Sequence, residues 1–309
     1  MEEKVFTKQL EEKTAEIEAL LRRYLPEECG YQKTVLEAMN YSMTAGGKRL
    51  RPMLMQETYR MFGGQGREIE PFMAAIEMIH TYSLVHDDLP AMDNDEYRRG
   101  RRTTHVVYGE AMGILAGDGL LNYAFETAFK AFPEEGREEG DISVRQFKSI
   151  ARALIVLASK AGIYGMIGGQ TADIEAEEQA GPVSAGQLLF IHEHKTAALI
   201  QAAMMAGAVL AGAGEDQVRL VEKCAYNIGI AFQIQDDILD VTGDSASLGK
   251  QVGSDARNNK QTYVTLHGLE KARADVDALS QEAAAILESF DGEHEFLKQL
   301  ILMLIRRQK

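Results

Sequence analysis

The sequence predicts an all-α fold, a single-domain helical bundle over residues 1–309. Ala, Leu, Met, Glu and Gln, which favour helix, dominate the composition, whereas alternating runs of Val, Ile and Thr are scarce. Only 6 prolines occur, so few helices need to be interrupted. Hydrophobic residues make up 45% of the chain, which is enough to bury a sizeable core.

Apolar periodicity and turn-forming residues divide the chain into helical runs. In chain order, these runs are expected near 4–24, 31–44, 49–62, 70–88, 106–131, 143–178, 184–211, 215–241, 263–289 and 293–307. Turns rich in glycine or containing proline separate several of them, at 44–47, 63–66, 133–136 and 180–182. The run at 143–178 is expected to break near 162–169. Asp141, Ser143 and Ser184 are expected N-caps.

Charge and apolar patterning restrict the classes of function. The net charge of −14 argues against a nucleic-acid partner, whose phosphates need a basic surface. The charged amphipathic N-terminus lacks the apolar region of a signal peptide. The apolar stretch 197–214 is rich in Ala and Gly and contains Gln201, so we expect a buried central helix rather than a membrane span. Cys29 and Cys224 are too few for a disulfide scaffold. These features indicate a soluble cytoplasmic protein.

The first acidic cluster lies at 86–95 and reads HDDLPAMDND. Asp87 and Asp93 are six residues apart, which is out of phase for one continuous helix. Pro90 disfavours helix at Leu89, so the helix is expected to end or bulge there. We expect the following residues to loop out, so that Asp93 turns back towards Asp87.

The second acidic cluster lies at 233–240 and reads QIQDDILD. Asp236 and Asp240 are four residues apart and share one side of a helix. Carboxylates beside an apolar face repel one another unless a cation joins them, and oxygen-only clusters suit Mg²⁺. If both clusters face one cavity, they would form a clamp for a diphosphate.

Several cationic residues accompany the acidic clusters. The segment 46–52 reads GGKRLRP and places Lys48 and Arg51 at a helix start, where anions bind readily. Arg98 and Arg99 directly follow the first cluster, and arginine is the preferred bidentate partner of phosphate. Further candidates are His80, Lys195, Thr196, Lys250 and Lys260. Together they indicate a site for two phosphate-bearing ligands.

These motifs resemble those of the trans-isoprenyl diphosphate synthase family, in particular its bacterial-type farnesyl diphosphate synthases. The resemblance runs from 46–52 through both acidic motifs to the 250–269 region. It implies a bundle of about ten core helices around a central cavity, as a homodimer. It also implies a Mg²⁺-dependent transferase that condenses dimethylallyl or geranyl diphosphate with isopentenyl diphosphate to give farnesyl diphosphate, with fifteen carbons. Three Mg²⁺ ions per site are expected, with Mn²⁺ as a substitute.

The resemblance also implies a role for each group of residues. Mg²⁺ would be bound by Asp87, Asp88 and Asp93, and a further Mg²⁺ by Asp236, Asp237 and Asp240. The allylic diphosphate would be neutralised by Arg98, Lys195, Lys250 and Lys260. Isopentenyl diphosphate would be held by Lys48, Arg51, His80 and Arg99. The reacting carbons would be lined by Thr196 and Gln233, and the helix with Gln170 and Asp173 would face the cavity.

Product length is expected to depend on Tyr82 and Ser83, which lie before the first acidic motif. Tyr82 is five residues before Asp87, about 7.5 Å lower along the helix. In similar enzymes an aromatic residue there accompanies a fifteen-carbon product. The alternative interpretation is that Tyr82 is an ordinary core aromatic.

Other functions stay open at this point. A twenty-carbon geranylgeranyl diphosphate synthase would share all these motifs. A class I terpene cyclase also ionises allylic diphosphates with Mg²⁺, but it has no need of a second diphosphate pocket. A non-catalytic partner subunit would be expected to have lost acids. A lid formed by the 243–262 loop and the C-terminal residues 306–309 is a further hypothesis.

Overall fold

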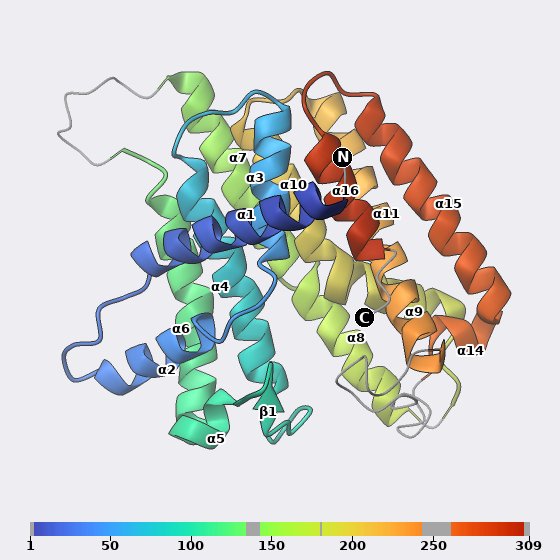
Figure 1. Cartoon of the computed structure of the whole chain (residues 1–309). Coiled ribbons are helices and arrows are strands. Elements are labelled where there is room, and N and C mark those ends of the chain that lie inside the picture. The colour runs from blue at the N-terminus through green and yellow to red at the C-terminus, as the bar shows by residue number, and fades with distance from the viewer. Residues whose placement is uncertain (1–2, 134–142, 180, 243–260, 306–309) are drawn as a thin grey trace. The chain divides into compact units, whose positions relative to one another are not determined.

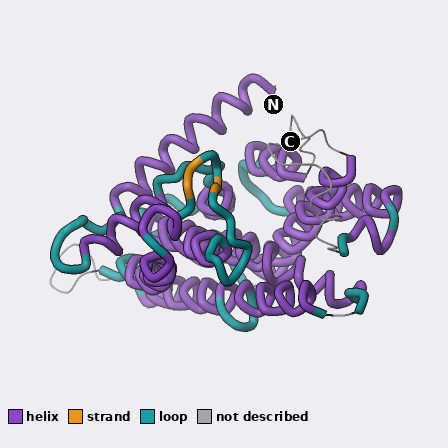
Figure 2. The backbone as a smooth tube through the Cα atoms, turned by 90° about the horizontal axis from the view of Figure 1, so that it is seen from below, coloured by secondary structure: helices purple, strands orange, loops and turns teal. Residues whose placement is uncertain are grey.

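The computed structural model describes residues 3–133, 143–179, 181–242 and 261–305. These ranges are mostly helical, with loops between the helices, as Figure 2 shows. Their only strands are β1 (Tyr97–Arg98) and β2 (Arg101–Arg102), which pair antiparallel with Tyr97 opposite Arg102. The prediction of an all-α fold is therefore confirmed.

Two compact units make up the chain. The N-terminal unit contains Glu2–Gln56 and Gln65–Leu154, and the C-terminal unit contains Glu57–Gly64 and Ile155–Lys309. Helices α3 (Leu50–Met61) and α7 (Val144–Ala161) contribute residues to both units. The expectation of a single domain stays a prediction.

In the N-terminal unit, helix α4 forms the centre of the packing. The other elements of this unit, besides the β1–β2 hairpin and parts of α3 and α7, are α1 (Glu3–Arg23), α2 (Lys33–Met43), α5 (Thr104–Tyr108) and α6 (Glu110–Phe129). Helix α4 (Ile69–Asp87) packs along α6 and also contacts α1 and α2, and Figure 1 shows α4 and α6 side by side. Phe72, Ile76 and Ile79 of α4 are fully buried. This packing fixes the C-terminal end of α4, where the first acidic motif begins.

In the C-terminal unit, helix α11 (Glu215–Thr242) packs against most of its neighbours. The remaining elements are α8 (Met166–Glu178), α9 (Ala185–Ile191), the π-helix η1 (His192–Ala197), α10 (Ala198–Leu210), α14 (Tyr263–His267), α15 (Leu269–Glu288) and α16 (Glu295–Ile305). Every residue of α10 is buried, which confirms the expected buried helix in the 197–214 stretch.

Glycine divides two of the predicted helical runs. Gly109 has φ of 89° and separates α5 from α6, and Gly268 has φ of 82° and separates α14 from α15. A residue in this region of φ cannot continue a right-handed helix, and glycine adopts it without a steric cost. The expected single runs at 106–131 and 263–289 are therefore each two helices.

Two predicted helix starts are confirmed by their hydrogen bonds. The hydroxyl of Ser143 accepts the N–H of Gln146 at 3.1 Å, and that of Ser184 accepts the N–H of Gln187 at 3.2 Å. These bonds satisfy N–H groups that have no partner inside the helix. The third expected cap, Asp141, lies outside the described residues.

One stretch, Val144–Glu178, is long and apolar enough to cross a membrane by length and composition. Only 33% of its most apolar window is buried, and the stretch contains the break between α7 and α8. A core helix of a soluble protein passes the same test, so this finding is weak support for a membrane span.

The loop before α3 is held by a buried ion cluster. Arg49 is 2% exposed and donates to Glu18 at 2.6 Å and to Glu77 at 2.7 Å. It also donates to the carbonyl of Met43 at 2.7 Å. Because Glu77 is also 2% exposed, each of these charges depends on its partner for compensation.

We expect Arg49→Met to lower the free energy of unfolding by about 3–5 kcal/mol, because it leaves the Glu77 carboxylate buried without its cation. Chemical denaturation of the full chain measures this loss. Arg67→Met is the matched control, because the Arg67 side chain is 82% exposed beside Glu70 and its loss should leave stability unchanged. Equal stability of the two variants would contradict the prediction.

Candidate active site

The first acidic motif begins where α4 ends. Asp87 is the last residue of the helix and Asp88 caps it. The chain then turns tightly, with the carbonyl of Leu89 accepting N–H groups from Met92 and Asn94. The N–H of Asp93 donates to the carbonyl of Asp87 at 2.8 Å. The prediction that Asp93 returns towards Asp87 is therefore confirmed.

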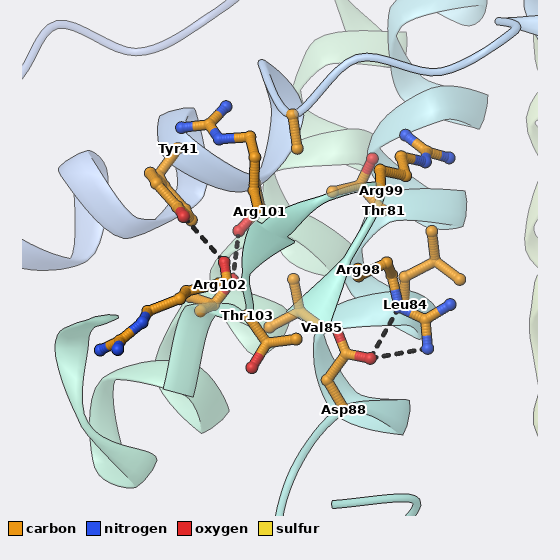
Figure 3. A pocket seen from close by; sticks show the side chains of 13 residues that line it. Tyr41, Thr81, Leu84, Val85, Asp88, Arg98, Arg99, Arg101, Arg102 and Thr103 are labelled. Carbon is orange, nitrogen blue, oxygen red and sulfur yellow. Dashed lines mark hydrogen bonds and ion pairs between the residues drawn. The ribbon is translucent and has the colours of Figure 1, made fainter. Parts of the chain in front are cut away.

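Asp88 is tied to Arg98 of the β1–β2 hairpin. Oδ1 of Asp88 accepts Nε and Nη2 of Arg98, each at 2.6 Å (Figure 3). Asp88 is 4% exposed. Burial raises the pKa of this carboxyl, Arg98 opposes the rise, and the nearby Asp95 and Asp93 add to it. The pair therefore keeps a charged carboxylate in a site that would otherwise favour its protonation.

A small pocket of about 40 Å³ lies where α2, α4 and the β1–β2 hairpin meet. It is lined by Tyr41, Ser42, Ala45, Thr81, Leu84, Val85, Asp88, Arg98, Arg99, Arg101, Arg102, Thr103 and Thr104. Tyr41 fastens the hairpin to α2, because its hydroxyl donates to the carbonyl of Arg102 at 2.7 Å and Arg101 lies over its ring at 4.3 Å (Figure 3). The hairpin thus presents four arginines beside the end of α4.

The glycine loop at 46–47 meets Arg99. Nη1 of Arg99 donates to the carbonyl of Gly46, and Gly47 has φ of 136°. A Cβ on Gly47 would lie 2.8 Å from the Arg99 guanidinium carbon, and a residue with a side chain would be strained at this φ, so glycine is favoured there. The predicted glycine-rich segment therefore brings its backbone against one of the predicted phosphate-binding arginines.

Arg51 and His80 share one cationic environment with Arg99. Burial lowers the pKa of Arg51 to about 10, with Glu77 opposing and Arg99 adding to the fall. Burial, followed by repulsion from Arg51 and Arg99, lowers the pKa of His80 well below its usual value. Nε of Arg51 is buried and has no hydrogen-bond partner within the described ranges. This cluster would gain from an anionic ligand, because such a ligand removes repulsion and supplies an acceptor.

The second acidic motif lies near the end of α11. Asp236 and Asp240 are partly exposed and one turn apart, as predicted. Asp237 is 5% exposed, and its Oδ2 accepts the N–H of Tyr263 at 2.6 Å. Nε2 of His192 lies 3.9 Å from the same oxygen. The two acids of the Asp236–Asp237 pair therefore have different surroundings.

Lys195 and Thr196 lie on η1. Nζ of Lys195 contacts Oδ2 of Asp173 at 2.6 Å, and the hydroxyl of Thr196 donates to Oε1 of Gln233 at 2.9 Å. The sequence singled out all four of these residues, and the structure brings them together in two pairs. Single π-helical turns often occur at functional sites, because they redirect side chains within a helix.

Glycines allow the neighbouring helices to approach η1 closely. A Cβ on Gly169 of α8 would overlap the backbone nitrogen of Lys195. A Cβ on Gly229 of α11 would lie 2.6 Å from Cα of Ala197. The backbone of η1 is therefore in direct contact with α8 and α11, which fixes the position of Lys195 and Thr196.

Tyr82 lies on α4 one turn before His86, and its side chain is buried. It is 5% exposed, and its ring meets the ring of His86 edge to face at 5.8 Å. The His86 ring is held in turn by the carbonyl of Ile114, 3.0 Å from Nε2. Burial raises the pKa of Tyr82 to about 12, and its hydroxyl lacks a hydrogen-bond partner among the described residues. Ser83 donates to the carbonyl of His80 at 2.9 Å.

The acidic motifs fit Mg²⁺ in the chemistry of their donors, since both supply only oxygen ligands. Within the described ranges, no group of three or more His, Cys, Asp or Glu side chains is arranged to hold a metal ion. Mg²⁺ usually takes one or two carboxylates and completes its shell with water and substrate phosphates. The motifs therefore suit an ion that arrives with a phosphate ligand.

Several predicted site residues are either exposed or outside the described part of the chain. Lys48 is exposed beside the glycine loop. Lys250, Lys260 and the C-terminal residues 306–309 lie outside the described residues, as does most of the 243–262 loop.

Sequence reasoning missed the structural roles of Arg49 and Tyr263. Lys48 and Arg51 lie close to Arg49 in the sequence, and nothing in the residue pattern indicated that Arg49 pairs with two glutamates in the core.

Comparison with known proteins gives a consistent picture. A family model described as polyprenyl synthetase matches residues 32–300. Farnesyl diphosphate synthase of Geobacillus stearothermophilus is 45% identical over 264 residues, which is 85% of each chain. Farnesyl diphosphate synthase of Escherichia coli (strain K12) is 44% identical over 308 residues, which is 98% of this chain and 99% of its own. Geranylgeranyl diphosphate synthase of Cyanophora paradoxa is 40% identical over 90% of this chain and 88% of its own.

Solved structures share the fold. An FPP/GFPP synthase from Zymomonas mobilis matches with a TM-score of 0.83 and 32% identity, over 97% of this chain and 98% of its own. A geranyltransferase from Helicobacter pylori, solved in complex with magnesium and isoprenyl diphosphate, matches with a TM-score of 0.78 and 31% identity. That match covers 96% of this chain and 95% of its own.

We expect Gly169→Ala to displace η1, because the added methyl group meets the backbone of His194 and Lys195. Overpacking of this kind costs about 1–3 kcal/mol, and the variant should also lose most of its catalytic activity. Thermal unfolding and a steady-state assay measure the two effects. Gly186→Ala is the control, because its Cβ meets nothing within 4 Å. Parental stability and activity in Gly169→Ala would show that η1 tolerates the methyl group.

Proposed function

The chain belongs to the polyprenyl synthetase family, and from this premise we propose that it is a Mg²⁺-dependent farnesyl diphosphate synthase. As a prenyltransferase, it would join dimethylallyl or geranyl diphosphate to isopentenyl diphosphate. The observation that carries the proposal is the juxtaposition at the end of α4, where an aspartate motif adjoins a hairpin with four arginines. Carboxylates beside arginines suit a diphosphate that arrives with divalent ions.

In this proposal the allylic diphosphate loses its bond between C1 and oxygen, and the electron pair leaves with the diphosphate. The acids Asp87, Asp93, Asp236 and Asp240 would hold three Mg²⁺ ions, which neutralise charge on the leaving group when bound. Arg98 and Lys195 would add cationic contacts, together with Lys250 and Lys260. Asp88 and Asp237, which were predicted as ligands too, contact Arg98 and Tyr263 in this structure.

Isopentenyl diphosphate would bind to Lys48, Arg51, His80 and Arg99. The lowered pKa values of Arg51 and His80 support this role, because burial and then the positive charge of Arg99 lower them, and a bound diphosphate would supply the negative charge that this group of residues lacks. The double bond of the bound isopentenyl group would attack the allylic cation, and a proton would then pass to the diphosphate. Thr196 and Gln233 would line the reacting carbons and help to exclude water.

Product length would be set by Tyr82, with Ser83 beside it. The contact of Tyr82 with His86, and of His86 with the carbonyl of Ile114, supports a ring that stays in place. A rigid ring can stop an apolar chain sterically, whereas a mobile side chain yields. The runner-up function is a geranylgeranyl diphosphate synthase, since proteins of that name are also similar to this chain.

A cytoplasmic location is proposed from the acidic composition and the charged N-terminal helix α1. Fractionation of cells that express the full chain would contradict this location if the protein sedimented with the membranes.

We further propose that the chain forms a homodimer. The homodimer is supported by exposed apolar side chains of the N-terminal unit. These are Ile114 at 42%, Leu115 at 48%, Phe129 at 57% and Phe147 at 52%. Phe132 contacts the rings of both Phe129 and Phe147. An apolar surface of this kind is typical of an interface between protein chains.

Light scattering of the full chain should give twice the monomer mass of 34.2 kDa. Leu115→Glu should shift the protein towards the monomer, because a charge would be buried in the interface. Glu110→Gln, on the same helix, is the control and should leave the dimer intact. A mass of one chain at every concentration would contradict the dimer.

The test of function is a product assay with the full chain, isopentenyl diphosphate, dimethylallyl or geranyl diphosphate, and Mg²⁺. We expect a fifteen-carbon product that disappears when a chelator is added. Tyr82→Ala should lengthen the product, whereas Tyr82→Phe keeps the ring and should keep the product length.

Each other outcome contradicts one part of the proposal. A cyclic hydrocarbon would indicate a terpene cyclase, a twenty-carbon product from the parent chain would favour the runner-up, and no turnover would favour a non-catalytic subunit. A fifteen-carbon product from Tyr82→Ala would place the length control elsewhere.

A further inference from the structure

The β1–β2 hairpin is too short to hold its own position. Each strand has two residues, and an isolated two-stranded hairpin is at best marginally stable in water. The small pocket of about 40 Å³ is lined by four arginines of this hairpin, so close packing alone does not fix it. The position of the hairpin therefore depends on the side chains that tie it to neighbouring elements.

Tyr41 of α2 contacts both residues of β2. Its hydroxyl donates to the carbonyl of Arg102 at 2.7 Å, and the guanidinium of Arg101 lies 4.3 Å from the centre of its ring (Figure 3). The ring also meets the ring of Tyr108 edge to face at 5.6 Å. Because Tyr108 ends α5, the helix that follows the hairpin, the Tyr41 ring is held by a second element and can support β2.

Arg101 extends this contact to the end of α2. Its Nη1 donates to the carbonyl of Thr44 at 3.2 Å. Thr44 caps α2 at its C-terminal end, where the helix dipole favours a cation. Two residues further on, the carbonyl of Gly46 accepts Nη1 of Arg99. The short segment 44–46 therefore binds two arginines of the hairpin.

The two arginines at the tip of the hairpin are held by different elements. Arg98 is tied to Asp88 at the end of α4 through two N–H groups, each at 2.6 Å. Arg99 reaches the glycine loop, which follows α2 in the chain. Loss of the Tyr41 contacts would leave the bond of Arg98 to α4 in place, but it would let the turn of the hairpin shift relative to the glycine loop. Arg99 would then lose its alignment, whereas Arg98 would keep its own.

A separate bond ties α2 to the chain beyond the hairpin. Ser42 and Thr104 are both buried, and their hydroxyl oxygens lie 2.8 Å apart. This bond holds the start of α5 against α2 without Tyr41. A change of Tyr41 should therefore alter the hairpin rather than the packing of the helices.

We propose that Tyr41 and Arg101 are positioning residues that align the β1–β2 hairpin with the glycine loop, and that they thereby set the affinity for isopentenyl diphosphate. The inference rests on the proposed function, in which Arg99 binds that substrate and Arg98 binds the allylic one. Neither positioning residue needs to touch a substrate, because each acts through the place of Arg99.

Steady-state kinetics of the full chain separate the two substrates. Tyr41→Phe keeps the ring but loses the donated hydrogen bond, and it should raise KM for isopentenyl diphosphate about fivefold. Tyr41→Leu and Arg101→Gln lose the contact between guanidinium and ring, and each should raise this KM about tenfold. KM for geranyl diphosphate should stay within about twofold of the parent value. Tyr108→Phe is the matched control, because it removes a hydroxyl from the adjacent ring and leaves both contacts of Tyr41 in place.

Amide hydrogen exchange of the full chain tests the alignment without substrate or metal. Tyr41→Leu should speed exchange in 97–102 by about fivefold or more, and Tyr108→Phe should leave it unchanged. If Tyr41→Leu does not fold, Tyr41→Phe, which keeps the packed ring, takes its place with a smaller increase.

Three results would overturn the proposal. They are a parental KM for isopentenyl diphosphate in all the Tyr41 and Arg101 variants, an equal rise of both KM values, and parental exchange in 97–102 when Tyr41 is changed. If the parent chain makes no prenyl product, the proposed function fails, while hydrogen exchange still decides whether Tyr41 holds the hairpin.

Discussion

The guanidinium of Arg49 lies in the core of the N-terminal unit, between the carboxylates of Glu18 and Glu77. This buried compensation of charge holds the loop before α3, and that loop presents its glycines to Arg99. The pattern recurs at Asp88 with Arg98 and at Lys195 with Asp173. A charge out of water is costly unless an opposite charge lies beside it, so each pair fixes the position of both its members.

The candidate functional residues lie where helices end or depart from regular α-helical geometry. The first acidic motif starts at the end of α4, the second lies near the end of α11, and Lys195 lies on a π-helical turn. At such places some backbone N–H and C=O groups have no partner inside the helix, and side chains can point in directions that a regular α-helix does not allow. The regular parts of the same helices are apolar and buried, and they provide the rigid support.

Much of this organisation could be predicted from the sequence, because it depends on local rules. Apolar periodicity located the helices, and Pro90 predicted both the end of α4 and the return of Asp93. Thr196 and Gln233 were paired only through a family resemblance, because no local rule connects residues so far apart. The structure joins these two side chains by a hydrogen bond of 2.9 Å.

The features that could not be predicted depend on the direction of a side chain or on the register of backbone hydrogen bonds. Gly109 and Gly268 lie within the predicted helical runs, and nothing in their neighbours indicates a positive φ. The two acids of an Asp-Asp pair look alike in a sequence, although the structure buries only the second. The inward turn of Arg49 depends on Glu18 and Glu77, which lie 31 and 28 residues away in the chain.

The π-helical turn η1 places a constraint on length rather than on composition. A π-helix accommodates one residue more than an α-helix over the same span, and each residue of a helix rotates the next side chain by about 100°. Deleting one residue from His192–Ala197 would therefore let this span close as regular α-helix, with α9 and α10 keeping their relative rotation, and would redirect the side chains of the turn itself, Lys195 and Thr196 among them. Insertions and deletions should be excluded from this segment more strictly than from the surface turns, even where single exchanges of side chains are tolerated.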